Sequence, residues 1–244
     1  MWHGSAERVP LLLFNGIGAN VELLAPIADR LPDVEVIAFD APGVGGSGPA
    51  YRPYRPWQYA LLTTRLLDEL GYRRKVDVLG VSWGGAMAQQ LAFQARRRVR
   101  RLVLAATSTG ALMVPGHPRV LLKLASPRRY LDADYLERHF AALYSDEKGS
   151  GDHAARIKPP TLPGYLFQLL AGAGWTSAPF LPLIPHETLV LTGRRDPIVP
   201  SINGRILARL IPRARLQIVD GGHLFLMSQA IQVMPLIDEF LAAD

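Results

Sequence analysis

A serine between two glycines carries the clearest chemical signal in the chain. Gly80–Gly84 reads Gly-Val-Ser-Trp-Gly, which matches the pattern Gly-x-Ser-x-Gly. An apolar run begins before it at Val76, and good helix formers without proline follow it, so a strand should turn into a helix at Ser82. Such a tight turn exposes the serine hydroxyl at the edge of a sheet. Ser82 is therefore a candidate nucleophile, although a serine that caps a helix in a glycine-rich turn would fit the same pattern.

Two further residues are suited to activate this hydroxyl. A serine needs a base to take its proton, and the base needs a third group to orient it. The expected chain order after such a serine is an acid and then a histidine. Asp196 and His223 each follow a predicted strand, so both should lie at the same sheet edge as the serine. Asp220 and Asp40 also end predicted strands and are the alternatives for the acid, but the order and spacing favour Asp196.

Negative charge that develops on a carbonyl oxygen needs backbone donors aimed at it in advance. One donor should be the amide of Trp83, the residue after the candidate nucleophile. The other is expected in the loop Asn15–Asn20 after the first predicted strand, where we choose the amide of Ile17. Gly16 and Gly18 would let that backbone approach the serine closely, although an ordinary glycine turn would also explain them.

Alternating strands and helices should position these residues. Short apolar runs predict strands, and the stretches between them have helical patterns, the first over residues 22–31 and the last over about 225–241. The predicted strands span residues 10–14, 34–39, 76–79, 102–107, 187–193 and 215–220. This alternation implies an α/β fold with a mostly parallel sheet and helices on both faces.

The alternation stops at Thr109 and resumes at Glu187. The intervening residues contain repeated proline and glycine, four short helical patterns and no convincing strand. The helical patterns lie around residues 120–124, 134–144, 165–171 and 179–183. We therefore expect a helical cap, residues 111–185, inserted between two parts of one core, residues 1–110 and 186–244. It should cover the sheet edge at which open α/β folds bind ligands.

Composition excludes several other classes of protein. The 244 residues include no cysteine, so disulfides, thiolate nucleophiles and cysteine metal sites are excluded, and we expect neither a metal nor a cofactor. Gly43–Gly48 matches Gly-x-Gly-x-x-Gly, but Pro49, Pro53 and Pro56 follow it and indicate a loop instead of the helix that a dinucleotide site requires.

The net charge of +6 does not by itself indicate nucleic-acid binding. Its densest part, Arg96–Arg101, lies between a predicted helix and a predicted strand and has no interleaved aromatic residues, so we expect no nucleic-acid partner. No apolar run approaches the ~20 residues that span a bilayer. The apolar run near the N-terminus is too short for a signal peptide. We therefore expect a soluble cytoplasmic protein without a transmembrane segment.

Eight segments together resemble one known family. They are FNGIGAN, AFDAPGVGGSG, GVSWGGAMAQQ, LVLAAT, ASPRRY, AGAGWTS, LVLTGRRDPIVP and DGGHLFLM. The chain is similar, from Pro10 onward, to the intracellular medium-chain-length poly(3-hydroxyalkanoate) depolymerases of the α/β-hydrolase superfamily. The resemblance implies an α/β-hydrolase fold with Ser82, Asp196 and His223 as its triad. It also implies esters of medium-chain 3-hydroxy acids, stored in cytoplasmic granules, as the substrate.

Three features depart from that family. Only a few residues precede the first predicted strand where the family has an N-terminal strand pair, so we expect either a shortened sheet edge or a misassigned start site. Arg194 and Arg195 precede Asp196 where the family is acidic, which should alter the local charge but leave the acid in place. The segment Ser145–Gly164 differs from the family's cap and bears on the access of a polymer to the site.

The leading hypothesis is a serine esterase that acts on poly(3-hydroxyalkanoate) or its oligomers through an acyl-enzyme, with the granule surface as its partner. In the cap, Tyr165, Phe167, Leu169 and Trp175 are candidates to line an acyl channel, although each would equally pack the cap onto the core. One alternative is a general carboxylesterase or lactonase for small acyl esters, and another is a catalytically silent granule-binding protein. The oligomeric state is left open.

Overall fold

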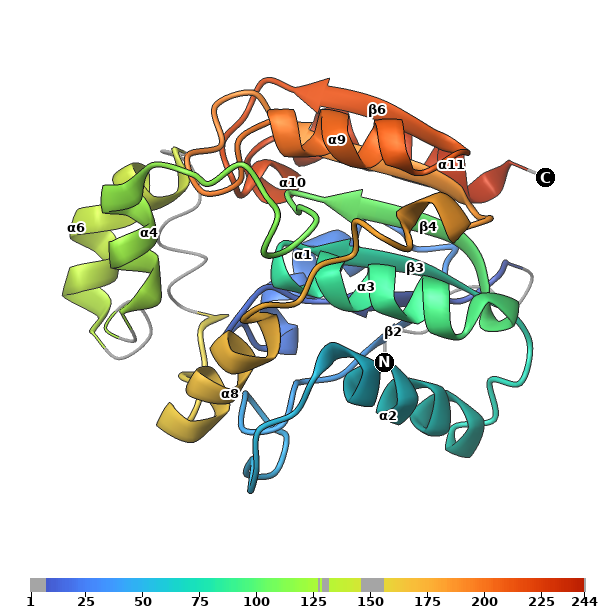
Figure 1. The fold of residues 1–244 in the computed structure, drawn as a ribbon, viewed down its shortest axis with the longest axis horizontal. Coiled ribbons are helices and arrows are strands. Elements are labelled where there is room, and N and C mark those ends of the chain that lie inside the picture. The colour runs from blue at the N-terminus through green and yellow to red at the C-terminus, as the bar shows by residue number, and fades with distance from the viewer. Residues whose placement is uncertain (1–7, 127, 129–131, 146–155, 244) are drawn as a thin grey trace.

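A six-stranded parallel sheet forms the centre of the molecule (Figure 1). The computed structural model describes residues 8–126, 128, 132–145 and 156–243. The strands are β1 (Leu11–Phe14), β2 (Val36–Ala38), β3 (Val76–Val81), β4 (Val99–Ala105), β5 (Glu187–Gly193) and β6 (Ala214–Val219). Their order across the sheet is β2-β1-β3-β4-β5-β6, and every neighbouring pair is parallel. The predicted α/β fold class is confirmed.

Helices cover both faces of this sheet. One face is covered by α1 (Ala25–Ala28), α10 (Phe225–Ser228) and α11 (Ala230–Ala242), and the other by α2 (Pro56–Glu69), α3 (Trp83–Gln94) and α9 (Ile202–Leu210). Successive side chains of a strand point to opposite faces. Leu11 and Leu13 accordingly belong to the first core, and Leu12 and Phe14 to the second. Within the described residues, no helix is both long enough and apolar enough to cross a bilayer.

Residues 111–185, which we call the insertion, connect β4 to β5. Their described part contains α4 (Pro118–Ala125), α6 (Ala133–Tyr144), α8 (Leu162–Gly172), the 3-10 turn η3 (Leu181–Leu183) and no strand of its own. Its helices α4, α6 and α8 lie beyond the end of the sheet toward which the strand arrows point (Figure 1). The use of residues 111 and 185 as domain boundaries stays a prediction. Residues 127 and 129–130 of ASPRRY, and 146–155 of the departing segment, lie outside the described residues.

Two predicted helices are shorter than expected. The first, predicted over residues 22–31, consists of the 3-10 turn η1 (Val21–Leu24) and the single turn of α1. Pro26 is the second residue of α1, and because proline lacks an N–H and clashes with the preceding turn, it favours a new helix start there over a continuation of η1. The last predicted helix is divided into α10 and α11 at Gln229, whose φ of −118° and ψ of 26° turn the chain out of the helix.

The start of α3 lies directly against the end of β1. A Cβ atom on Gly84 would stand 2.3 Å from the carbonyl oxygen of Phe14 and 2.5 Å from that of Asn15. Both obstacles are backbone atoms, which cannot rotate away as a flexible side chain does. Glycine at this position therefore sets how closely the helix after Ser82 approaches the loop after β1.

We expect Gly84→Ala to destabilise the protein by about 1–3 kcal/mol, because the added methyl group must push the helix from the strand. For a chain of this size that corresponds to roughly 2–12 °C in the midpoint of thermal unfolding. Gly172→Ala is the matched control, since a Cβ at Gly172 meets nothing within 4 Å. Circular dichroism melting curves of both variants measure the difference. Equal midpoints for the two variants would contradict the close-approach argument.

Candidate active site

Ser82 lies between β3 and α3 with a strained backbone. Its φ of 55° and ψ of −117° are unusual for a residue with a side chain. Three hydrogen bonds hold it there: its N–H donates to the Ala105 carbonyl at 2.9 Å, and its carbonyl accepts from the Thr107 hydroxyl at 2.7 Å and the Gly85 N–H at 2.9 Å. Because neighbouring segments fix the backbone on both sides, the turn directs the hydroxyl into the pocket described below.

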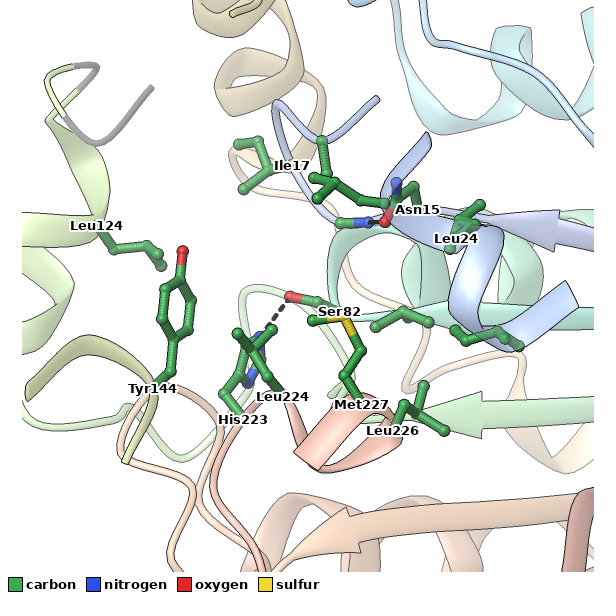
Figure 2. Close-up of a pocket in the computed structure, with 15 residues that line it drawn as sticks. Asn15, Ile17, Leu24, Ser82, Leu124, Tyr144, His223, Leu224, Leu226 and Met227 are labelled. Carbon is green, nitrogen blue, oxygen red and sulfur yellow. Dashed lines mark hydrogen bonds between the residues drawn. The ribbon is translucent and has the colours of Figure 1, made fainter. Parts of the chain in front are cut away.

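A chain of hydrogen bonds joins the three residues that the sequence analysis selected. The Oγ atom of Ser82 lies 3.1 Å from Nε2 of His223, and Nδ1 of the same imidazole lies 2.7 Å from Oδ2 of Asp196 (Figure 2 shows the first contact). His223 is 6% exposed and Asp196 is 5% exposed, so water is largely excluded from the pair. The structure thus brings together side chains that are 27 and 141 positions apart in the sequence.

The carboxylate of Asp196 is held by its own loop as well. Its Oδ1 atom accepts hydrogen bonds from the backbone N–H groups of Ile198 and Val199, both at 2.9 Å. These donors compensate the buried negative charge and leave Oδ2 directed at the imidazole. The backbone N–H of His223 donates to the carbonyl of Tyr144 at 2.8 Å, so the insertion fixes the histidine loop from the other side.

The alternative acids lie elsewhere. The side chain of Asp220 is 71% exposed and its charged partner is Arg195, at 3.7 Å. Asp40 accepts from the N–H of Val21 and of Gly46, and burial raises the pKa of this carboxyl. Neither carboxylate has a described contact with the His223 ring. Arg195, one of the basic residues that depart from the family pattern, is therefore engaged at the surface.

The loop after β1 approaches the serine closely. A Cβ built on Gly16 would lie 3.8 Å from the Cβ of Ser82. The side chain of Asn15 supports this loop, because its Oδ1 accepts from the N–H of Gly16 at 2.8 Å and its Nδ2 donates to the carbonyl of Asn20 at 2.7 Å. Ile17, the predicted second oxyanion donor, lies in the same loop and lines the pocket at Ser82.

Trp83, the predicted first donor, is the opening residue of α3. The N–H groups at the start of a helix have no partner within it, and they lie at the positive end of the helix dipole. The indole of Trp83 turns away from the pocket: its Nε1 donates to the carbonyl of Gln168, and its ring meets that of Tyr59 edge to face at 5.5 Å. Only the backbone of Trp83 is therefore suited to the role that the sequence predicts.

An apolar pocket opens at the Ser82 hydroxyl (Figure 2). Its lining consists of Asn15, Gly16, Ile17, Ala19, Leu23, Leu24, Ile27, Val81, Ser82, Leu124, Tyr144, His223, Leu224, Leu226 and Met227. In Figure 2, Leu24, Leu226 and Met227 lie on one side of the serine, and Leu124 and Tyr144 lie on the other. No lysine, arginine, aspartate or glutamate is present among the described residues that line it. The pocket is thus suited to uncharged, largely apolar ligands.

The structure does not place the four predicted substrate-contacting residues of the insertion in this lining. Tyr165 is 1% exposed, and its hydroxyl donates to the carbonyl of Leu124 at 2.6 Å. Trp175 donates from Nε1 to Oε1 of Gln90 at 2.9 Å. Phe167 is half-buried and Leu169 is exposed on the surface of α8. The described contact of Trp175 thus joins the insertion to α3 of the core, and that of Tyr165 joins α8 to α4 within the insertion. The substrate-contacting role of the four residues stays a prediction.

Most of the pocket lining was not predicted from the sequence. The apolar wall comes from η1, α1 and α10, whose leucines look like ordinary core residues in the sequence. A usable signal was their position, because Leu23 and Leu24 follow the predicted oxyanion loop, and Leu226 and Met227 follow His223 by one helical turn. Tyr144 had no such signal, since it reaches the pocket from the last residue of α6.

The glycine-rich segment Gly43–Gly48 wraps around a carboxylate. Oδ2 of Asp40 accepts from the N–H of Gly46 at 2.8 Å, and a Cβ on Gly45 would stand 2.2 Å from that oxygen. A negative charge therefore stands at the position where a dinucleotide loop would hold a phosphate. In the part of the chain that the structure describes, no three histidine, aspartate or glutamate side chains are grouped to hold a metal ion.

These contacts define the chemistry that the arrangement can support. An imidazole fixed by a carboxylate can take the proton of a serine hydroxyl 3.1 Å away. Backbone amides of two segments lie next to that serine, where they can receive a developing oxyanion. The parts of the ligand on either side of the reacting bond would be apolar, because the pocket lining is largely apolar.

Comparison with known proteins identifies the family. A family model described as the alpha/beta hydrolase fold matches residues 9–230. The chain belongs to the α/β-hydrolase family. It is 50% identical to a poly(3-hydroxyalkanoate) depolymerase of Ectopseudomonas oleovorans, over 99% of this chain and 87% of the relative. The resemblance predicted from the sequence is confirmed, and the protein is a hydrolase of the α/β fold.

Two further proteins are similar to this chain over nearly its whole length. A 2-hydroxymuconate semialdehyde hydrolase of Pseudomonas sp. strain CF600 is 31% identical, over 98% of this chain and 89% of the relative. A hydrolase from Pseudomonas aeruginosa PA01, known from its crystal structure, has a TM-score of 0.82 at 27% identity and covers 99% of this chain and 92% of its own. Both likenesses extend over nearly the whole chain, so the insertion is included in them.

The two roles of the Asp196 carboxylate can be separated by substitution. Asp196→Ala leaves the buried N–H groups of Ile198 and Val199 without an acceptor, and an unpaired buried group costs about 1–3 kcal/mol. Asp196→Asn keeps an oxygen at the Oδ1 position. We expect the alanine variant to lose about 2 kcal/mol or more in urea unfolding and the asparagine variant less than half of that. Equal losses would show that these two backbone contacts do not stabilise the loop.

Proposed function

We propose that the protein is a serine hydrolase that cleaves the ester bonds of medium-chain-length poly(3-hydroxyalkanoate) or of its oligomers. The observation that carries the proposal is the hydrogen-bonded chain from Asp196 through His223 to Ser82, which ends in an apolar pocket. The poly(3-hydroxyalkanoate) depolymerase that is 50% identical to this chain supports the choice of substrate.

The first half of the reaction forms an acyl-enzyme. Oγ of Ser82 attacks the ester carbonyl carbon while Nε2 of His223 takes its proton, and the carboxylate of Asp196 stabilises the imidazolium that results. The carbonyl oxygen becomes an oxyanion held by the backbone N–H groups of Ile17 and Trp83. When the bond to the alkoxy oxygen breaks, His223 gives its proton to that oxygen and the alcohol leaves.

The second half regenerates the enzyme. A water molecule takes the position of the alcohol and gives a proton to His223 as its oxygen attacks the acyl carbon. The bond to Oγ of Ser82 then breaks, the serine recovers the proton, and the hydroxy acid is released. No group other than water is consumed, so the chemistry requires no cofactor.

The two sides of the pocket take different parts of the ester. The leaving oxygen must come within reach of the imidazole of His223, so the alcohol portion lies toward Tyr144 and Leu224. The acyl portion then extends to the opposite side, toward Leu24 and Met227 (Figure 2). Its apolar wall suits the alkyl side chains of medium-chain 3-hydroxy acids, because each methylene removed from water contributes about 0.8 kcal/mol.

Ser82→Ala is expected to lower kcat by up to ~10⁶-fold, because the serine, histidine and aspartate act as a unit. The measurement pairs p-nitrophenyl esters of increasing acyl length with a latex of medium-chain polymer. A fluorophosphonate probe that forms a bond to a reactive serine should label the natural protein and not the variant. Undiminished hydrolysis by the variant would refute the proposed role of Ser82.

The same pair of assays separates the alternative functions. Hydrolysis of the latex with a preference for longer esters supports the proposal. Activity on short esters without any on the latex would indicate a general carboxylesterase or lactonase. A protein that binds the latex, hydrolyses neither substrate and is not labelled by the probe would be a silent granule-binding protein.

The proposed partner is the surface of a polymer granule in the cytoplasm, and α8 is the element best suited to meet it. Leucine side chains at positions 162, 166, 169 and 170 are 56%, 45%, 36% and 49% exposed. Their spacing places them along one side of the helix. Such an exposed apolar row on the insertion is typical of a surface that meets another apolar surface.

Replacing Leu166 and Leu170 together by glutamine should weaken adsorption to the polymer latex by about tenfold or more, since burial of leucine contributes about 1.5–3 kcal/mol when complete. Hydrolysis of a soluble short ester should not change, because neither side chain lines the pocket. Ile231→Gln, an 87% exposed residue of α11, is the control for a general loss of surface apolarity. Adsorption is measured by sedimentation with the latex. Equal adsorption by all three proteins would exclude α8 as the contact surface.

A further inference from the structure

Gln168 connects the insertion to both backbone segments that are proposed to hold the oxyanion. It is 1% exposed and belongs to α8. Its side-chain Oε1 accepts from the N–H of Gly18 at 2.7 Å, and its backbone carbonyl accepts from Nε1 of Trp83 at 3.1 Å. Gln168 therefore bonds to Gly18, which lies 150 positions away and follows the proposed donor Ile17. It also bonds to the side chain of Trp83, the other proposed donor, which lies 85 positions away.

We propose that Gln168 is a positioning residue for ester hydrolysis and fixes the two oxyanion donors at the spacing the transition state requires. This inference rests on the function proposed above. Gln168 is absent from the pocket lining and acts through Ile17 and Trp83. Its effect should therefore appear in the stabilisation of the transition state, with little effect on the binding of the ester.

The first contact acts on the loop that carries Ile17. The N–H of Gly16 is bound to Oδ1 of Asn15, and the N–H of Gly18 is bound to Gln168, so both neighbours of Ile17 are fixed. Peptide units are planar, and fixing the units on either side of one residue leaves little freedom for its own amide. Gly18 also has a φ of +69°, which glycine adopts without a steric penalty.

The second contact acts on the start of α3. The indole of Trp83 is held by the Gln168 carbonyl on one side and by the ring of Tyr59 on the other. A side chain fixed at both ends restrains the backbone from which it projects. Since the proposed donor is the amide of this same residue, movement of α8 would shift both donors together.

Other bonds tie the same loop to the insertion. Asn20 donates from Nδ2 to the carbonyl of Arg156 and accepts at Oδ1 from the N–H of Lys158, both at 2.9 Å. The side chain of Lys158 pairs with Glu22, and the hydrogen bonds from Lys158 and Asn20 lower the pKa of that carboxyl to about 2. The loop is thus anchored at residues 20–22 independently of Gln168, so loss of the Gln168 contact should loosen it locally without releasing it.

The decisive variant is Gln168→Met, which keeps the shape and the backbone carbonyl but removes the side-chain acceptor. Displacement of a reacting group by about 1 Å can reduce a rate about 10²-fold, and loss of a whole oxyanion donor reduces kcat about 10²–10³-fold. We expect kcat for a soluble p-nitrophenyl ester to fall by about 10- to 100-fold with KM changed less than about twofold. The rate of fluorophosphonate labelling should fall similarly, because the phosphoryl oxygen of the probe accepts hydrogen bonds from the same two backbone N–H groups.

Gln90→Met is the matched control. Gln90 is 8% exposed, and its Oε1 accepts from the indole of Trp175, so the variant also removes a glutamine acceptor between the core and the insertion. Because this contact is not part of the loop or of the pocket, kcat and the labelling rate should stay within about twofold of the natural protein. Melting midpoints of both variants show whether stability alone explains a difference.

Trp83→Phe provides a second test that does not depend on the folding of Gln168→Met. It removes the indole donor to Gln168 and retains the backbone amide, and it should lower kcat with KM unchanged. If both variants keep kcat within twofold of the natural protein, or if Gln90→Met loses as much activity as Gln168→Met, the positioning role is refuted. If the natural protein itself hydrolyses no ester and is not labelled, it is the proposed function that fails.

Discussion

The strained backbone of Ser82 is the constraint on which the rest of the site depends. A residue with a side chain adopts a φ of 55° together with a ψ of −117° only when its surroundings enforce it. Here the carbonyl of Ala105, at the end of β4, and the hydroxyl of Thr107, two residues after β4, bond to Ser82 from both sides, while Gly84 lets α3 begin against the end of β1. The parallel sheet therefore does more than support the serine. The neighbouring strand β4 and the residues that follow it supply bonds that hold the turn in an unfavourable conformation.

The insertion contributes to every part of the site. Its α6 packs on Ile198 and Val199, the residues that bind the carboxylate of Asp196, and its Tyr144 accepts from the backbone of His223. Its α8 bonds to the loop after β1 through Gln168. These contacts make the insertion a structural element of the site as well as a cover. Substitutions in the insertion are thus expected to affect the reaction mainly by shifting the backbone of the loops at the site, and less by changing a direct contact with the ligand.

The sequence predicted the chemical groups well and their surroundings poorly, for a physical reason. Ser82, Asp196 and His223 follow strands, and parallel strands bring their carboxyl ends to one edge, so strand prediction alone gives their proximity. The pocket wall has no such rule. Leu24 and Met227 meet at the serine because η1, α1 and α10 pack on the same face of the sheet. Tyr165, an aromatic residue of the predicted cap, bonds to the carbonyl of Leu124 and is absent from the lining. Helix periodicity predicts that such residues are buried but does not predict which element they face.

The charge of the pocket lining limits the possible ligands more than the shape of the pocket does. The buried charge of Asp196 is compensated by backbone N–H groups and the imidazole, so the described lining needs no cation and contains none. A carboxylate ligand there would lose its water without gaining a countercharge, which is strongly unfavourable in a largely apolar space. A neutral ester carries no such penalty, and its charge would appear only in the transition state, beside the proposed backbone donors. The arrangement therefore favours substrates whose only polar group near Ser82 is the bond to be broken.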